Sequence, residues 1–292
     1  SGVWIMAYTT IDDPSAYFQA YAYTGNGTDA RALTLPGDTD LAANLVWVKQ
    51  RNTTRNQIVA NSVCGTGKNL FADLNDPEDT TGGLITTFGS DGFTVSDSAN
   101  VNQDAGTYAS WSWNAGTTSG IGTSGQDITP SGYSINTTSK FGIYAYTGNG
   151  TDDSQINHGL SVAPHFVIVK SRSLDNSWTV FHHKNTAAPE TDYLKLDTNV
   201  TTADTDTVWS DQLPDTTDFT LGSGSGVNTN TATYVAFVWS SVQGFSKFGA
   251  YDGNGDADGP FIYTGFRPAF IIIKRTETEG SWNVMDIKRD PH

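Results

Sequence analysis

The feature that most constrains the fold of this chain is a motif that occurs three times. Phe18-Gln-Ala-Tyr-Ala-Tyr-Thr-Gly-Asn-Gly27 returns as Phe141-Gly-Ile-Tyr-Ala-Tyr-Thr-Gly-Asn-Gly150 and, in a shorter form, as Phe248-Gly-Ala-Tyr-Asp-Gly-Asn-Gly255. These copies lie too far apart for the units of a solenoid, which repeat every ~20–50 residues. The repeated unit is therefore of domain size.

Three further motifs recur in the same order along the chain. Leu45-Val-Trp-Val-Lys-Gln-Arg51 aligns with Phe166-Val-Ile-Val-Lys-Ser-Arg172 and with Phe270-Ile-Ile-Ile-Lys-Arg275. Ser90-Asp-Gly-Phe-Thr-Val95 aligns with Thr217-Asp-Phe-Thr-Leu-Gly222, and Tyr108-Ala-Ser-Trp-Ser-Trp113 aligns with Tyr234-Val-Ala-Phe-Val-Trp239. Several ordered matches indicate that the chain arose by duplication of one unit.

The repeated segments have the side-chain pattern of β-strands. From Phe141 to Tyr146, Phe141, Ile143 and Ala145 alternate with Tyr144 and Tyr146, which is the period of two that marks a strand. The Thr-Gly-Asn-Gly that follows supplies residues suited to a tight turn. No segment sustains the apolar spacing of a long helix.

We therefore predict an all-β protein of tandem antiparallel β-sandwich repeats, of a jelly-roll or lectin-like kind, connected like beads. The third repeat is expected to be incomplete, because the counterparts of the Asp-Gly-Phe-Thr and Tyr-Val-Ala-Phe strands do not occur after Phe270. Either the chain is truncated or another subunit completes that sheet. The predicted boundaries are repeat 1 at 1–116 (with an N-terminal extension at 1–17), a Gly/Ser/Thr-rich linker at 117–131, repeat 2 at 132–243 and a partial repeat 3 at 244–292.

Charge argues against two classes of partner. The formal net charge is −15, and no cluster of Lys and Arg offsets it, so phosphate backbones and anionic membranes are repelled. We expect no nucleic-acid partner. We also expect no membrane insertion, because no apolar run approaches the ~20 residues of a spanning helix.

Cys64 is the only cysteine, so it cannot form an intrachain disulfide, and it is expected to be a small, half-buried apolar residue.

Candidate catalytic groups do not assemble into a recognisable centre. His182 and His183 are neighbours, but adjacent residues of a strand point to opposite faces and do not readily chelate one ion. Asp and Glu total 31, so some pair always lies at the separation used by glycosidases. No carboxylate lies in a cluster of aromatic residues that recurs in both full copies. We therefore predict no catalytic residues, no bound cofactor and no enzymatic activity.

One acidic loop resembles the opening of a calcium site. Asn254, Asp256 and Asp258 alternate and are followed by Gly259, as in the first half of such a loop. The position of the closing bidentate Glu is occupied by Gly265. The competing interpretation is that this loop is the third copy of the Thr-Gly-Asn-Gly turn. Calcium is thus a weak candidate ligand.

Three tryptophans outside the Tyr-x-x-Trp strands are candidates for binding a sugar through an exposed ring. They are Trp178, Trp209 and Trp282. Trp178 and Trp282 occupy the same place in their copies, in Asn-Ser-Trp-Thr-Val and Gly-Ser-Trp-Asn-Val, which favours a packing role over a ligand platform.

The ordered motifs resemble a family of repeated β-domains in structural proteins of marine tailed phages, including cyanophages. The resemblance rests on aromatic-x-x-Tyr-Thr-Gly-Asn-Gly, Phe-Val-x-x-Lys-x-Arg, Ser-Asp-Gly-Phe-Thr and Tyr-Val-Ala-Trp, and it covers nearly the whole chain. Met6-Ala-Tyr-Thr-Thr-Ile is also similar to the amino terminus of that family.

The resemblance implies a non-enzymatic virion protein that is assembled in the host cytoplasm and carried on the extracellular particle. It would be a tail-fibre or receptor-binding component, or a fibre or knob that decorates the capsid. Its partners would be other virion proteins and a host cell-surface glycan, and it would form a homo-oligomer, with a trimer favoured. The alternatives are a carbohydrate-binding adhesion module and a polysaccharide depolymerase.

Overall fold

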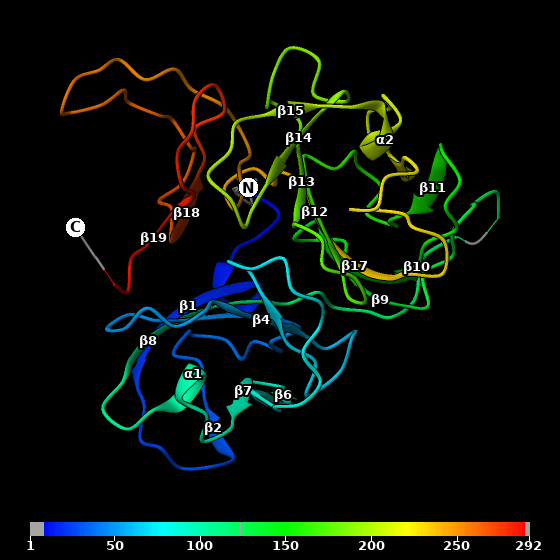
Figure 1. Cartoon of the computed structure of the whole chain (residues 1–292). Coiled ribbons are helices and arrows are strands. Elements are labelled where there is room, and N and C mark those ends of the chain that lie inside the picture. The colour runs from blue at the N-terminus through cyan, green and yellow to red at the C-terminus, as the bar shows by residue number, and fades with distance from the viewer. Residues whose placement is uncertain (1–8, 123, 290–292) are drawn as a thin grey trace, which may run out of the picture.

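The computed structural model describes residues 9–122 and 124–289, so Met6 and the first eight residues of the predicted N-terminal extension lie outside the described residues. The all-β prediction is confirmed, since antiparallel sheets make up nearly all of the regular structure (Figure 1). The helices of the described part are single turns: η1 (Pro14–Ala16), α1 (Ala99–Asn102) and α2 (Asp206–Trp209).

The first copy contains two sheets. The larger has the strand order β1-β8-β3-β4-β5 and the smaller has the order β2-β7-β6. The strands are β1 (Phe18–Thr24), β2 (Arg31–Leu33), β3 (Leu45–Gln50), β4 (Ile58–Asn61), β5 (Leu70–Phe71), β6 (Ile85–Gly89), β7 (Gly92–Val95) and β8 (Thr107–Trp113).

The second copy repeats this plan with extra strands at the edges. Its larger sheet has the order β15-β14-β13-β12-β17-β10-β9, and its smaller sheet pairs β11 with β16. The strands are β9 (Gly132–Asn136), β10 (Phe141–Thr147), β11 (Ser154–Asn157), β12 (Phe166–Ser171), β13 (Thr179–His182), β14 (Asp192–Lys195), β15 (Ala203–Asp204), β16 (Asp218–Leu221) and β17 (Thr233–Trp239).

The repeated motifs pair in the same register in both copies. In the first copy β1 runs antiparallel to β8, with Phe18 opposite Trp113. In the second copy β10 runs antiparallel to β17, with Phe141 opposite Trp239. The segments are therefore structural counterparts residue by residue. The strand β3 corresponds in the same way to β12, and β4 corresponds to β13.

The third copy forms one hairpin in the described residues. It consists of β18 (Phe270–Ile273) and β19 (Asn283–Asp286), which pair as β3 pairs with β4 and β12 with β13. The segment 248–251, whose counterparts are the long strands β1 and β10, is not in a strand.

The copies share a hydrophobic core, so the expectation of separate beads is wrong. One cluster lies inside the first copy and includes Val46 and Val48, and a second lies inside the second copy and includes Val167. A third cluster joins the copies and includes Trp47 and Ile168, which alternate with those valines along β3 and β12. Both faces of each large sheet are thus buried, one inside its own copy and one against the neighbouring copy.

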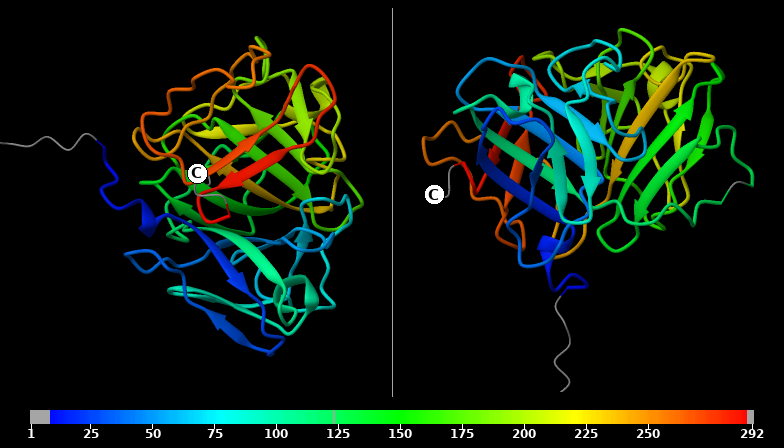
Figure 2. Two further views of the ribbon diagram at one scale, coloured as in Figure 1. Left: turned by 90° about the vertical axis from the view of Figure 1, so that its left-hand side faces the viewer. Right: turned by 90° about the horizontal axis from the view of Figure 1, so that it is seen from below.

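The three copies surround this shared cluster, which we call the central cluster. Half-buried side chains of the third copy pack against it, including Phe270, Ile272 and Trp282. In Figure 1 the first copy lies at the bottom, the second at the upper right and the β18–β19 hairpin at the left, and Figure 2 shows the same arrangement from two other sides. The chain is one body with three sheets facing a common centre.

The predicted linker at 117–131 is in part tied to the second copy. Gln126 Oε1 accepts a hydrogen bond from Asn157 N, and Asp127 Oδ2 accepts one from Gln155 N. Ile128 is buried in the core of the second copy. The end of the Gly/Ser/Thr-rich segment therefore packs along the strand β11.

Candidate functional site

Two of the predicted ligand-binding tryptophans join consecutive copies. The indole Nε1 of Trp178 donates to the backbone carbonyl of Phe71 at 2.8 Å, and that of Trp282 donates to the carbonyl of Lys195 at 2.8 Å. Phe71 and Lys195 are counterparts, because they lie opposite Ile58 and Thr179, the first residues of β4 and β13. The same bond therefore links the first copy to the second and the second to the third.

Burial largely removes these rings from solvent, in agreement with the packing role that the repeat favoured for Trp178 and Trp282 and against the alternative of a sugar-binding platform. Trp178 is 1% exposed and Trp209 is 3% exposed, while Trp282 is half-buried against the central cluster. Trp209 belongs to α2 and packs edge-on against Phe181 inside the second copy. The rings of Trp178 and Trp209 therefore have no open face that a sugar ring can cover.

A lysine also bonds each copy to the one before it, at equivalent positions of the second and third copies. Lys170 Nζ donates to the carbonyl of Asn75 at 3.0 Å and to that of Asn176 at 2.8 Å. Its counterpart Lys274 donates to the carbonyl of Asn199, the counterpart of Asn75, at 3.4 Å. Lys170 is fully buried, and desolvation lowers the pKa of its amine to about 8.

Backbone groups complete both junctions in the same way. Glu78 N donates to the carbonyl of Arg172 at 2.9 Å, and Thr202 N donates to the carbonyl of Thr276 at 3.0 Å. At the first junction the side chains add an ion pair, since the Arg172 guanidinium donates to both carboxylate oxygens of Glu78 at 2.7 and 2.9 Å. Tryptophan, lysine and backbone therefore define one junction that occurs twice.

The first and third copies meet through a different contact. The indole of Trp111 donates to Asp286 Oδ2 at 3.1 Å, and Arg289 binds the same carboxylate while its guanidinium lies over the Trp111 ring. The hydrogen bonds from Arg289 help to lower the pKa of Asp286 against the effect of its burial. The third copy is thus fastened to both of its neighbours.

The predicted calcium loop forms a turn in which the side chain of Asn254 is already used. Asn254 Oδ1 accepts from Asp256 N at 3.1 Å, as Asn26 accepts from Thr28 and Asn149 from Thr151. Asn254, Asp256 and Asp258 are all exposed. This geometry is that of the recurring turn, and within residues 9–122 and 124–289 no three His, Cys, Asp or Glu side chains converge on a metal position.

Two buried asparagines that the sequence did not single out hold this turn in the complete copies. Asn228 Nδ2 donates to Asn149 Oδ1 at 3.1 Å and to the carbonyl of Thr151 at 2.8 Å, while Asn228 Oδ1 accepts from Asn149 N at 2.9 Å. Asn102 makes the corresponding three bonds in the first copy. The signal was present, since both asparagines lie five residues before the Thr-Tyr that opens β8 and β17.

His165, His182 and His183 form a structural group at one end of β12 and β13. The rings of His165 and His183 lie 4.1 Å apart, and His165 Nδ1 accepts from Ser241 N at 2.8 Å. In the first copy the same place is held by Asn44, whose Oδ1 accepts from Ala115 N. Desolvation lowers the pKa of His165 and His183, and it lowers the pKa of His182 to about 4.

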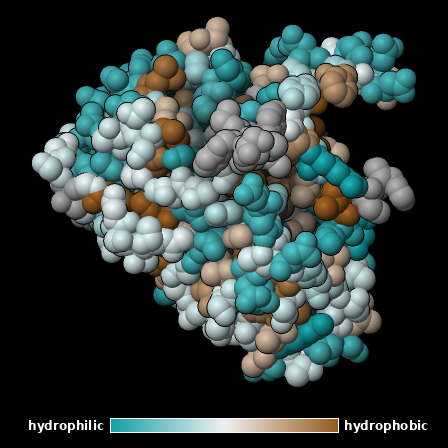
Figure 3. All heavy atoms as spheres, turned by 180° about the vertical axis from the view of Figure 1, so that it is seen from behind, coloured by the Kyte–Doolittle hydropathy of each residue, from teal (hydrophilic) through white to brown (hydrophobic). Residues whose placement is uncertain are grey.

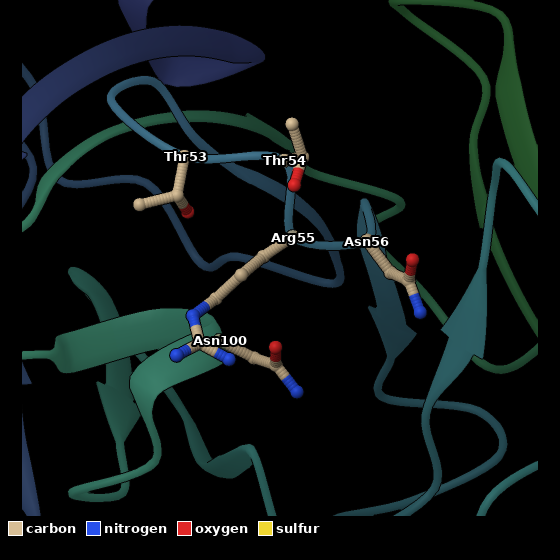
Figure 4. Close-up of a pocket in the computed structure, with 5 residues that line it drawn as sticks. All are labelled: Thr53, Thr54, Arg55, Asn56 and Asn100. Atoms are coloured by element: carbon tan, nitrogen blue, oxygen red, sulfur yellow. The ribbon is translucent and has the colours of Figure 1, made fainter.

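Two open surface depressions are polar. The first lies between the β3–β4 loop and α1, where the side chain of Arg55 points toward Asn100 (Figure 4). The second lies between the second and third copies. Their lining residues are Thr53, Thr54, Arg55, Asn56 and Asn100 in the first, and Asn185, Thr186, Thr201, Thr202, Thr276 and Glu277 in the second. Neither lining includes an aromatic ring.

Cys64 is half-buried and packs against the central cluster, and burial raises the pKa of its thiol.

Over the described ranges, none of the helices has the length and apolar character required to traverse a bilayer.

Residues 13–292 match the model of a domain of unknown function (DUF7483). No curated protein and no solved structure matches the chain.

Proposed function

The chain belongs to the DUF7483 family, and from this premise we propose that it is a non-enzymatic structural protein of a virus particle that displays polar surface for assembly and attachment. Two observations support this proposal. The ordered motifs resemble those of phage virion proteins, and the structure joins three copies of one unit into a single body.

We infer that each complete copy is a β-sandwich. In the first copy the five-stranded sheet and the β2-β7-β6 sheet both contribute to one core, with Val46 and Val48 from the first and Phe93 and Val95 from the second. In the second copy Val167 and Val169 of the large sheet share a core with Phe219 and Leu221 of β16. Side chains from two facing sheets that fill one core are typical of such sandwiches.

The observation that carries the proposal is the repeated junction between copies. The Trp178–Phe71 and Trp282–Lys195 hydrogen bonds place successive copies in the same relation around the central cluster. A junction that is used twice builds a rigid unit from one domain, which suits a protein whose task is to hold surfaces at fixed positions. Repeated display also multiplies weak contacts through avidity.

The surface chemistry favours selective contacts over broad adhesion. A net charge of −15 on a chain whose apolar residues fill three clusters leaves an acidic, polar exterior. Such a surface repels other polyanions and keeps the particle that carries it dispersed. A partner would therefore be recognised through hydrogen bonds from loops, as with a neutral glycan or a protein surface.

The test is to locate the protein in intact particles. Antibodies raised against the purified chain and coupled to gold should label the tail or the capsid of purified virions in electron micrographs. Mass spectrometry of the same particles should recover its peptides in stoichiometric amounts. Absence of the protein from purified particles, with abundance in the infected cell, would refute the proposal.

The same purified chain separates the alternatives. A carbohydrate-binding module would bind glycans on an array without particle association. A depolymerase would shorten host polysaccharide on incubation, which size-exclusion chromatography detects. The proposed structural role predicts no shortening of polysaccharide, and sedimentation measures whether the chain forms the expected homo-oligomer.

A further inference from the structure

The strand β18 has an open edge that its counterparts do not have. In the first copy β3 lies between β8 and β4, and in the second copy β12 lies between β17 and β13. Among the described residues, β18 pairs with β19 on one side and with no strand on the other. The backbone groups along that side are thus positioned to accept a further strand.

Apolar side chains are exposed where the other copies bury theirs. Ile271 is 39% exposed, whereas its counterparts Val46 and Val167 are 0% exposed. Met285 is 45% exposed, whereas its counterparts Ala60 and Phe181 are each 1% exposed.

The segment that precedes β18 shows the same difference. Phe261 is 91% exposed and Ile262 is 42% exposed, and their place in the repeat is that of β2 and β11. In the complete copies those strands pair with β7 and β16. Figure 3 shows this segment as an arm that stands off the body at the upper right, with hydrophobic atoms at the surface near its base.

We propose that β18 binds an added antiparallel strand with the chemistry of β8 and β17. The two strands share the pattern Thr-Tyr-x-small-aromatic-x-Trp, read from Thr107-Tyr-Ala-Ser-Trp-Ser-Trp113 and Thr233-Tyr-Val-Ala-Phe-Val-Trp239. The register follows from the copies. The final Trp of the added strand lies opposite Phe270, as Trp113 lies opposite Leu45 and Trp239 opposite Phe166.

The side chains of such a strand find matching surfaces on both faces of β18. The aromatic residue at its fifth position and the final Trp face the central cluster, as Trp111 and Trp113 do in the first copy. Phe270 already lies 5.6 Å from the ring of Trp113 there. Trp113 and Trp239 lie 6.2 Å apart and are both half-buried there, so a third tryptophan adds to an existing pair. The residue before the final Trp lies opposite Ile271, as Val238 lies opposite Val167 in the second copy.

The backbone of the added strand bonds through alternate residues. Arg172 N donates to the carbonyl of Thr233 at 2.7 Å, so Thr233, Val235 and Phe237 direct their backbone groups toward β12. Ala236 and Val238 direct theirs away. A strand on β18 uses the same alternation, and this distinguishes backbone pairing from nonspecific apolar adhesion.

The experiment uses the full chain and a synthetic peptide of residues 230–241, with fluorescence anisotropy as the readout. The peptide should bind saturably. N-methylation of the peptide nitrogens at Val235 and Phe237 should weaken binding at least about tenfold, because it blocks the pairing edge. N-methylation at Ala236 and Val238, which face away from β18, is the matched control and should change affinity less than about threefold.

Variants of the protein test the site itself. Ile271→Lys places a charge on an exposed residue and should weaken binding at least about tenfold, while Leu213→Lys, at an exposed apolar residue of the second copy, should not. Equal weakening by both N-methylated peptides would overturn the proposal, as would equal affinity of the Ile271→Lys variant. A stable dimer of the chain that Ile271→Lys dissociates, with no peptide binding to the monomer, would assign the edge to self-association instead and would also overturn it.

Discussion

The indole nitrogen of Trp178 lies 2.8 Å from the carbonyl oxygen of Phe71, a residue 107 positions earlier in the chain. This bond crosses from the second copy of the repeat to the first. Trp282 makes the corresponding bond to Lys195, so the junction between the second and third copies has the same hydrogen bond as the junction between the first and second.

Replacing Trp178 by Phe should destabilise the protein by about 2–4 kcal/mol, because the carbonyl of Phe71 loses its donor in a buried place and the ring becomes smaller. Trp209→Phe is the matched control, since the buried Trp209 Nε1 has no hydrogen-bond partner and only its packing changes. Urea unfolding of both variants measures the difference. Equal losses would show that the hydrogen bond contributes nothing.

The Arg172–Glu78 pair should couple the first two copies. Arg172→Lys loses the two-pronged bond to the carboxylate, and we expect a loss of about 1–2 kcal/mol in the free energy of unfolding. A double-mutant cycle with Glu78→Gln should give a coupling energy of about 1 kcal/mol or more. Additive losses would contradict a direct interaction.

Asn228 should be intolerant of a charge. Asn228→Asp removes the donor to Asn149 and Thr151 at a fully buried position, so we expect a loss of about 2–4 kcal/mol. Asn254→Asp changes an exposed residue of the third turn and should stay within about 0.5 kcal/mol of the parent. Thermal unfolding of the two variants, at one pH and one salt concentration, checks the contrast.

Lys170 should make stability rise with pH in the alkaline range. Its pKa in the folded protein is about 8, below the value of an unfolded chain, so the folded state releases this proton first. The unfolded state then binds more protons from about pH 8 to pH 10.4, and folding is favoured by up to about 3 kcal/mol as the pH rises through that window. Lys170→Met should remove this component from unfolding curves recorded between pH 7 and 10.

His182 should contribute to acid unfolding. Desolvation holds its pKa at about 4, below the usual value near 6.5, so the unfolded state takes up the proton first as the pH falls. Stability attributable to His182 is therefore complete above about pH 6.5 and declines toward pH 4, by about 3 kcal/mol. His182→Asn, which introduces the residue of the first copy at this place, should flatten the decline. An unchanged slope in the variant would assign the acid sensitivity to other groups.

The sequence by itself determined the repeated strands of the two complete copies and the requirement that both copies pair them alike. Alternation along Phe141–Thr147 and Phe18–Thr24 defines strands locally, and repetition in the same order requires the same pairing in both copies, which the matching registers show. The turn at Asn254 was likewise readable, because its relation to Asn26 and Asn149 lies in the repeat alone.

Only the tertiary structure decided what covers each face of a sheet. Val46 and Trp47 are both apolar, and nothing local shows that one packs inside its copy while the other packs in the central cluster. The burial of Trp178 depends on the carbonyl of Phe71, a residue of another copy, and the position of His182 beside His183 and His165 depends on the end of a hairpin. The sequence of a strand shows that both of its faces are apolar. Which part of the molecule packs against each face is set by contacts between residues far apart in the chain.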